Sequence, residues 1–288
     1  MKIAHLILAH KNPAQLARLV KALQHPDFDF YIHIDKKTAE SPFCEALAGN
    51  NIFFIKKRTK IYWAGYGTIQ ATLNGFEEIL DTGKAYGYIN VLSAQDFPIK
   101  SAGYIHQYFS NRRGTEFITC ESIENEWKEA ASRVKKFHLI NWKIPGKYRI
   151  EKWINKILPE RTFPLDYKLV GRANWFTLTP DAVQYVLSFL QKNPKVVRFF
   201  KYCWGADEFI FATVLYNSSF RDQITPNTTY VDWTGRTDGH PRILLTSDLE
   251  RLKIADKLFA RKFDIETDVR IIELLEGWIT QDAGSVQN

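Results

Sequence analysis

Short apolar runs that alternate with helical repeats constrain the fold of this chain most strongly. The run IAHLILA at residues 3–9 is apolar at every position but one, as in strands that are buried on both faces. Apolar residues then recur at the spacing of a helix, at Leu16, Leu19, Val20 and Leu23. A strand that passes directly into a helix is the unit of a parallel α/β sheet.

The same alternation continues along the chain. We predict further strands at residues 28–35, 51–57, 86–94, 115–121 and within 167–179. Helices are predicted around Ile69, Leu73, Phe76 and Leu80, around Val183, Val186 and Leu190, and over the apolar stretch 207–215. The fold class is therefore α/β, a Rossmann-like and mostly parallel sheet with helices on both faces, in one domain over residues 1–288. In such folds ligands bind at the carboxyl ends of the strands.

Composition supports a globular protein of the cytoplasm. The 288 residues are 45% hydrophobic, and no run approaches the roughly 18 uncharged apolar residues of a membrane span. The first apolar run lacks the features of a signal peptide. Cys44, Cys120 and Cys203 lie far apart without metal-ligand spacing, so we expect buried thiols in a reducing compartment.

The net charge of +7 is concentrated in one window. Residues 127–165 contain ten Lys or Arg and only three Glu, with Trp127, Trp142 and Trp153 interleaved. We interpret this window as part of a basic insertion at about residues 122–166. Its composition fits contact with an anionic membrane, an acidic glycan or a nucleic acid, and equally the solvated face of an inserted subdomain.

Polar residues at predicted strand ends are the first candidates for a ligand site. His10 follows the first strand, Asp35 ends the second, and Asp96 follows the strand at 86–94. A carboxylate in the position of Asp35 commonly holds a ribose hydroxyl, although Asp is also an ordinary turn residue. The first strand is followed by no Gly-x-Gly-x-x-Gly, and the chain has no Walker loop, which disfavours a dehydrogenase and a P-loop enzyme.

Two other stretches carry charges beside apolar residues. In WGADEFIFATV, Asp207 and Glu208 begin a predicted apolar helix; they could complement the helix dipole, or burial could raise the pKa of one and suit it to accept a proton. In KLFARKFD, Arg261 and Lys262 stand side by side between phenylalanines. The simplest interpretation of such cations is that their stems lie on apolar surface and their charges reach water.

Six ordered blocks together resemble one known family. They are HLILAHKNPAQLARLVKAL, FYIHIDKK, VLSAQDFPIKS, GRANWFTLT, WGADEFIFATV and FARKFD. The chain resembles the core-2/I-branching β-1,6-N-acetylglucosaminyltransferases, together with their peptide O-xylosyltransferase relatives. The resemblance implies a GT-A-type fold with a mixed, mostly parallel sheet, a UDP-sugar donor and inversion at the anomeric carbon. It also implies catalysis without a metal ion or other cofactor.

The resemblance assigns roles to three residues. Glu208 matches the general base, while Arg242 and Lys262 match two cations that hold the donor diphosphate. Arg261, one position away, keeps the surface interpretation. The literal Asp-x-Asp at residues 27–29 precedes a strand instead of following one, so we interpret it as a loop and strand entry, not as a metal site.

The acceptor side is less well defined because the basic insertion does not align with the family. His10 and Asp35 are predicted to contact the nucleotide. Asp96 is placed near the donor sugar or the acceptor. Four further residues are placed there with a structural role as an equal alternative: Glu121, Trp127, Asp232 and Trp233.

We therefore predict an inverting, metal-independent transferase of bacterial type. UDP-N-acetylglucosamine is the first-choice donor, with UDP-xylose, UDP-glucose and UDP-galactose as alternatives. The expected acceptor is a hydroxyl of a glycan or lipid-linked glycan in cell-surface polysaccharide synthesis, reached in the cytoplasm or at the inner face of an anionic membrane. We expect no nucleic-acid partner, although a nucleic-acid-binding or glycan-binding protein without catalysis is the alternative from another class.

Overall fold

A seven-stranded mixed sheet forms the centre of the protein. The computed structural model describes the chain except residues 173, 236–238 and 286–288 and the side chains of 281–285. The sheet has the order β10-β6-β9-β4-β1-β2-β3. Its strands are β1 (Lys2–Ala9), β2 (Phe28–Ile34), β3 (Ile52–Phe54), β4 (Tyr86–Ser93), β6 (Glu116–Phe117), β9 (Thr177–Leu178) and β10 (Ile224–Thr225). Strands β1 to β4 run parallel and only β9 is antiparallel to its neighbours, which confirms the predicted sheet.

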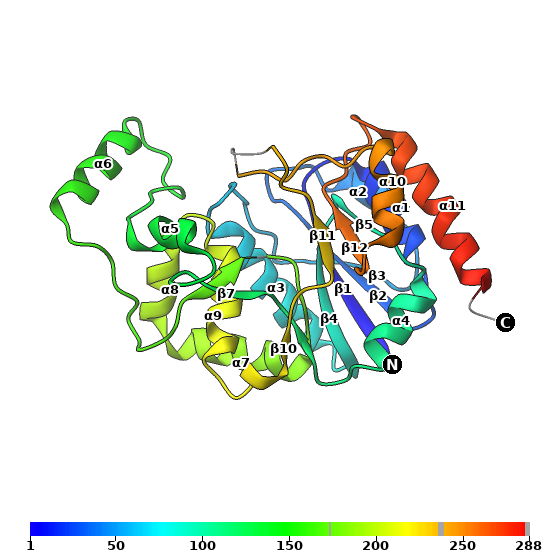
Figure 1. Ribbon diagram of the computed structural model, residues 1–288, viewed down its shortest axis with the longest axis horizontal. Coiled ribbons are helices and arrows are strands. Elements are labelled where there is room, and N and C mark those ends of the chain that lie inside the picture. Colours follow the sequence, from blue (N-terminus) through cyan, green and yellow to red (C-terminus); the bar gives the residue numbers. More distant parts are fainter. Residues whose placement is uncertain (173, 236–238, 286–288) are drawn as a thin grey trace.

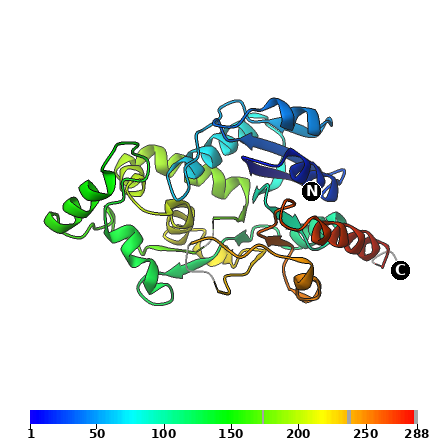
Figure 2. The ribbon, with the colours of Figure 1, turned by 90° about the horizontal axis from the view of Figure 1, so that it is seen from above.

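Helices cover both faces of this sheet (Figures 1 and 2). One core contains the even-numbered side chains of β1, such as Leu6, and the apolar faces of α3 (Gly67–Asp81), α7 (Pro180–Lys192), α8 (Pro194–Lys201) and α9 (Ile210–Tyr216). The other contains Ile3, Ile7 and the faces of α1 (Pro13–Ala22), α2 (Ser41–Ala46), α4 (Ala102–Ser110), α10 (Leu249–Ile254) and α11 (Val269–Ser285). The alternation of side chains along a strand explains why both faces of β1 are apolar.

Two small sheets complete the fold. One has the order β11-β12-β5, from β11 (Thr229–Val231), β12 (Phe259–Arg261) and β5 (Asp96–Pro98). The other pairs β7 (Cys120–Ser122) with β8 (Val170–Arg172). The predicted return of residues 167–179 to the central sheet is therefore only partly right, because β9 joins that sheet and β8 does not.

The predicted helix at 207–215 is divided. A 3₁₀ turn over Ala206–Glu208 precedes α9, so Asp207 and Glu208 lie before the α-helix and not in its first turn. Gly205 enters this turn with φ +61°, a left-handed conformation that glycine adopts readily. The sequence pattern missed this break because two acidic residues before an apolar run are also typical of the first turn of an α-helix.

The expectation of buried thiols is right only for Cys203. Cys44 is exposed and Cys120 is half-buried, although all three cysteines are free.

The basic insertion forms an extension at one end of the molecule. It comprises a 3₁₀ turn at Lys128–Ala130, α5 (Ala131–Lys135) and α6 (Lys147–Ile157), and α6 stands away from the body in both ribbon views (Figures 1 and 2). Trp127 is buried at its base, whereas Trp142 and Trp153 are exposed. No helix in the described part of the chain is long and apolar enough to cross a bilayer.

Candidate active site

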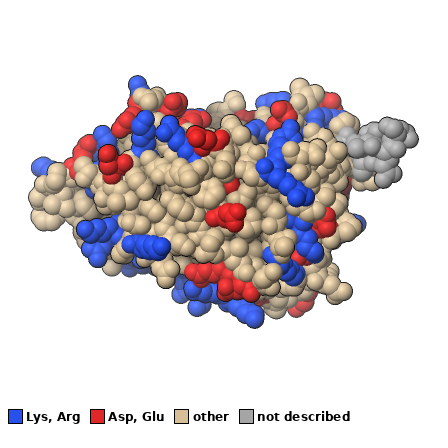
Figure 3. All heavy atoms as spheres, turned by 90° about the horizontal axis from the view of Figure 1, so that it is seen from below, with Lys and Arg blue, Asp and Glu red and all other residues tan. Residues whose placement is uncertain are grey.

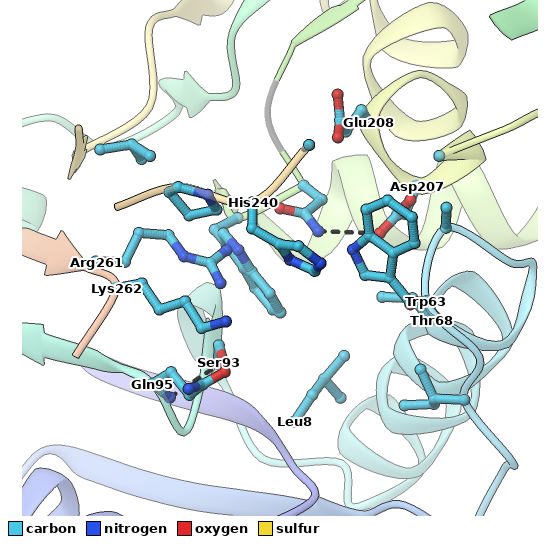
Figure 4. A pocket seen from close by; sticks show the side chains of 18 of the residues that line it. Leu8, Trp63, Thr68, Ser93, Gln95, Asp207, Glu208, His240, Arg261 and Lys262 are labelled. Atoms are coloured by element: carbon cyan, nitrogen blue, oxygen red, sulfur yellow. Dashed lines mark hydrogen bonds between the residues drawn. The ribbon is translucent and has the colours of Figure 1, made fainter. Parts of the chain in front are cut away.

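A cavity of about 560 Å³ opens where β1, β2 and β4 end (Figure 4). His10 follows β1, Asp35 follows β2 and Ser93 ends β4, and all three line it. Glu208 and Lys262 line the same cavity from segments far along the chain. The structure therefore brings together residues of all six sequence blocks, with Arg172 from the fourth, at the strand ends where a ligand was expected.

Glu208 reaches the cavity from the 3₁₀ turn, which β8 presses against. A side-chain carbon added at Gly171 would lie 2.1 Å from the backbone oxygen of Glu208, so only glycine permits this approach. The Glu208 side chain is 22% exposed and accepts a hydrogen bond from Arg133 Nη1 at 2.9 Å. Burial, and then the neighbouring charge of Asp207, raise the pKa of Glu208 to about 7 although Arg133 opposes the shift. A carboxylate with such a pKa can accept a proton near neutral pH.

Asp207 differs from its neighbour in its surroundings. It is buried, and Asn174 donates a hydrogen bond to its Oδ2 at 2.9 Å, drawn as a dashed line in Figure 4. Burial also raises the pKa of Asp207. Both carboxylates line the cavity, but Glu208 has the charged partner, Arg133, and Asp207 the neutral one.

Arg261 and Lys262 both line the opposite wall, and the peptide bond between them is cis (Figure 4). The surface interpretation of Arg261 is wrong, because its side chain is 13% exposed and lies inside the protein. β12 pairs with β5 in a register that sets Arg261 opposite Asp96. Arg261 Nε lies 3.3 Å from Asp96 Oδ1 without the alignment of a hydrogen bond, and Trp175 packs 4.7 Å from the guanidinium.

Asp96 therefore lies behind the cavity wall and not in it. It is fully buried, and its Oδ2 accepts the Ser93 N–H at 2.8 Å. Burial raises the pKa of Asp96 to about 6, with Arg261 acting in the opposite direction. Its contact with the site runs through Arg261 and Ser93, which both line the cavity.

Arg242 is held in a separate cluster. Its guanidinium donates to Asp232 Oδ2 at 2.6 and 3.0 Å and to Asp248 Oδ1 at 2.6 Å. Arg251 approaches the same two carboxylates at 3.4 and 3.3 Å. The Thr234 N–H, and then Arg242, lower the pKa of Asp232 to about 2. Neither Arg242 nor Asp232 lines the cavity, although Trp233, His240 and Pro241 beside them do.

His10 and Asp35 sit where the sequence placed them, at strand ends on the cavity. Burial, and then the charge of Lys11, lower the pKa of His10. Asp35 is buried, and its Oδ1 accepts the N–H of Lys37 at 2.9 Å and that of Ile61 at 3.3 Å. Asp35 thus performs the ordinary turn role and also faces the cavity.

Aromatic side chains form one rim of the cavity. Trp63 is 52% exposed, and its ring lies 5.0 Å from that of Trp204 and 4.6 Å from that of His240. Trp233, which the sequence placed near the acceptor, lines the cavity and is 47% exposed. Sequence reasoning missed Trp63 and His240; the tryptophan in the glycine-rich stretch YWAGYG was the available signal.

Glu121 and Trp127 do not line the cavity. Glu121 pairs with Arg172, which does line it, at 2.6 Å. Trp127 is buried and stacks on Phe209 at 4.8 Å, with Arg133 at 5.2 Å from its ring. Glu121 therefore contacts a cavity residue directly, whereas Trp127 contacts Arg133, the partner of the cavity residue Glu208.

The Asp-x-Asp at residues 27–29 lies outside the cavity, as a loop and strand entry. Asp29 is in β2 and pairs with Lys84 at 2.9 Å. Asp27 contacts the N-terminal amine at 3.0 Å and His106 at 2.8 Å. His25, Asp27 and His106 form the one group among the described residues that could together ligate a metal ion, and this group does not line the cavity.

Residues 3–253 match the family described as Core-2/I-Branching enzyme. The chain belongs to this family. It is 25% identical over 309 residues to xylosyltransferase 2 of Rattus norvegicus, covering 96% of this chain and 33% of that protein. It is 24% identical over 310 residues to a β-1,3-galactosyl-O-glycosyl-glycoprotein β-1,6-N-acetylglucosaminyltransferase of Homo sapiens, covering 95% and 68%. A third relative is β-glucuronosyltransferase GlcAT14B of Arabidopsis thaliana, 25% identical over 282 residues, with 91% and 63% covered.

This family member spans about a third of the length of the xylosyltransferases that it matches. Its relatives are named for transfer of three different sugars, so membership supports a glycosyltransferase and leaves the donor open. The mixed sheet with helices on both faces agrees with the GT-A-type fold expected from the sequence blocks.

Proposed function

We propose that this protein is an inverting glycosyltransferase that moves a sugar from a UDP-sugar to a hydroxyl of a glycan acceptor without a metal ion. The observation that carries the proposal is the arrangement of the cavity: a carboxylate with a pKa of about 7 on one wall and a pair of cations on the other. An acid–base group and fixed positive charges are the two requirements for displacing a diphosphate with a neutral hydroxyl.

In the proposed step, the acceptor oxygen attacks the anomeric carbon as Glu208 takes the hydroxyl proton. The bond from that carbon to the UDP oxygen breaks, and its electron pair remains on the β-phosphate. Attack opposite the leaving group inverts the anomeric carbon. The negative charge that develops on the diphosphate is the charge that fixed cations stabilise.

Lys262 and Arg261 are the proposed cations at the diphosphate because both line the cavity. Arg242, which the sequence blocks also assign to the diphosphate, remains a proposed contributor. Its guanidinium already donates hydrogen bonds to two carboxylates, which offset part of the positive charge that it can offer to a diphosphate. His10 and Asp35 are proposed to contact the nucleotide from the ends of β1 and β2.

For the donor we propose N-acetylglucosamine, with xylose, glucose and galactose as the alternatives. One relative carries N-acetylglucosaminyltransferase in its name, and others carry xylosyltransferase. Trp63 and Trp233 are exposed at the rim and offer flat apolar faces on which a sugar ring of the acceptor can stack. We propose a cell-surface or lipid-linked glycan as acceptor, met at the inner face of a membrane.

The first test is a thermal-shift panel of UDP-sugars followed by Glu208→Gln. We expect a UDP-sugar to raise the unfolding temperature of the wild type and of the variant alike, because binding to the folded state stabilises it. Turnover of the variant should fall by about 10²–10⁴-fold, the range for loss of a general base. Asp207→Asn is the matched control and should lose less.

Three outcomes would contradict the proposal. If Glu208→Gln stays active while Asp207→Asn is inactive, the base is Asp207 and not Glu208. Acceptor binding without any donor hydrolysis or transfer would indicate a glycan-binding protein. Salt-sensitive binding of oligonucleotides without UDP binding would favour the nucleic-acid alternative.

A further inference from the structure

The helix α6 presents its apolar side outward. Seven of the twelve exposed large apolar side chains in the described part of the chain lie between residues 142 and 158. They are Trp142, Ile144, Tyr148, Ile150, Trp153, Ile157 and Leu158. No residue of α6 is buried, whereas a helix of a globular protein ordinarily turns its apolar face to the core.

The polar side of α6 is the side that contacts the protein. Glu151 Oε2 accepts the Leu139 N–H at 2.8 Å. Four residues later, Asn155 accepts the Phe137 N–H at 2.7 Å and donates to the Phe137 carbonyl at 2.8 Å. Residues four apart share one face of a helix, so these bonds orient the helix with that face inward.

The other side of the helix carries Ile150, Trp153 and Ile157. Their spacing of three and four residues places them on one face, and they are 38%, 64% and 57% exposed. The hydrogen bonds of the polar face thus hold an aromatic and aliphatic stripe toward solvent.

The charges around this stripe are basic. Residues 143–158 contain five Lys or Arg and one Glu, and none of the five forms an ion pair with a carboxylate of the described residues. In Figure 3 the left end of the molecule, which carries α6, shows uncharged surface with blue Lys and Arg below it and both blue and red patches above it. An apolar stripe flanked by cations is the pattern of helices that lie in the interface of an anionic bilayer.

We propose that α6 docks this protein on an anionic membrane, with Ile150, Trp153 and Ile157 in the interface and the flanking cations on lipid headgroups. A protein partner with an apolar groove would cover the apolar stripe but would not account for the cations. The five Lys and Arg without a carboxylate partner favour a surface with many negative charges. Trp suits the interface because its ring is amphipathic.

The attachment of this segment links the membrane to the cavity. Asn141 accepts the Tyr66 N–H at 3.1 Å, and Lys143 Nζ lies 4.3 Å from the ring of Tyr62. Tyr62 directly precedes Trp63 of the cavity rim, and Tyr66 follows Trp63 by three residues. A docked α6 therefore brings the rim close to the lipid surface, where a lipid-linked acceptor would be found; this use rests on the proposed function, whereas the docking itself does not.

The test is co-sedimentation of the full chain with vesicles of phosphatidylcholine alone or mixed with phosphatidylglycerol. We expect binding to the anionic vesicles only, weakened as salt is raised. Ile150→Ser, Trp153→Ser and Ile157→Ser together should reduce the partition coefficient at least about tenfold. Ile254→Ser with Val269→Ser, which changes exposed apolar residues of α10 and α11, is the matched control and should bind as the wild type does.

Charge is tested in the same way. Lys152→Glu with Lys156→Glu should weaken binding by more than about tenfold, since each basic residue at an anionic surface contributes roughly fivefold. Lys21→Glu with Arg270→Glu, on the helices α1 and α11 at the other end of the molecule, makes the same change in net charge and should have little effect. UDP-sugar thermal shifts should be equal in all these variants.

Equal binding of wild type and triple variant, or no vesicle binding by the wild type, would overturn the proposal. So would a wild-type dimer in light scattering that the triple variant converts to monomer, because the stripe would then be an interface between copies. If the wild type binds UDP-sugars but not anionic vesicles, the docking proposal fails and the proposed reaction does not.

Discussion

Arg242 and Arg261 differ in how much of their charge is already used. Arg242 donates to two carboxylates at hydrogen-bond distance and lies outside the cavity lining. Arg261 faces one carboxylate without hydrogen-bond alignment and lines the cavity. A positive charge that is neutralised by two partners offers less to an arriving diphosphate than one that is not. A cation that matches a family motif is therefore not necessarily available to the substrate.

The largest expected effect separates the two arginines by their affinity for UDP. Arg261→Met and Lys262→Met should each weaken UDP binding by about 100-fold, because a charge-assisted contact in a buried wall is lost. Arg242→Met should cost about tenfold or less. Calorimetric titration with UDP measures all three. If Arg242→Met abolishes binding while Arg261→Met leaves it intact, the comparison is reversed and the cavity wall has been wrongly assigned.

The free energy of unfolding should separate the two arginines in the opposite direction, with the larger loss in Arg242→Met. Arg242→Met leaves Asp232 and Asp248 with Arg251 as the remaining cation among the described residues. The Thr234 N–H, the largest cause of the low pKa of Asp232, remains in the variant and keeps this carboxylate charged near neutral pH. We expect a loss of about 2 kcal/mol in the free energy of unfolding. Arg261→Met should lose less at pH 6. The pKa of Asp96 is already about 6 with Arg261 present and rises further without it, so Asp96 becomes neutral by protonation.

Urea denaturation at pH 6 and pH 8 checks this difference. The pKa of Asp96 is raised in the folded state, so its ionisation opposes folding, and the stability of Arg261→Met should fall as pH rises through the folded pKa. The outcome that breaks the comparison is an Arg261→Met that is destabilised equally at both pH values.

A third arginine, Arg133, pairs with the proposed base Glu208, so its effect should appear in the pH dependence of the reaction. Glu208 must be deprotonated to accept a proton, so kcat/KM should rise with pH through about 7 and level off above it. Arg133 favours the charged form, and Arg133→Met should therefore move the midpoint to higher pH. Activity should fall several-fold at pH 6.5 and less at pH 9.

Initial rates across this pH range provide the measurement, with Arg161→Met as control. Arg161 belongs to the same insertion but donates to backbone carbonyls, such as that of Tyr202 at 3.0 Å, and not to Glu208. A profile that does not move in Arg133→Met would show that the acid limb belongs to another group.

The smallest expected effect is that of a chelator. If Arg261 and Lys262 supply the charge that a divalent cation provides in other GT-A enzymes, excess EDTA should leave the rate of transfer unchanged within about twofold. A rate that collapses with EDTA and returns with manganese would mean that the fixed cations do not perform this role.

Much of the architecture could be predicted because local sequence patterns determine it. Largely apolar runs at residues 3–9, 28–35 and 86–94 became β1, β2 and β4 within one residue of their predicted ends, since a strand buried on both faces is apolar at most positions. Ligand-facing residues at strand ends, such as His10 and Asp35, follow from the same topology. Glu208 and Lys262 could be named from their sequence blocks, and both line the cavity.

The tertiary structure decided what happens to each charge after folding. Arg261 is buried because β12 pairs with β5 in a register that sets it opposite Asp96, and Arg242 is occupied because Asp232 and Asp248 converge on it from other segments. Nothing local in KLFARKFD or HPRILL records those partners. From its amino acids alone the main sheet, the family and the residue proposed as base could be named. Tertiary contacts decided which cations face the cavity and turned the apolar side of α6 outward, because burial and charge pairing depend on residues that only the fold brings together.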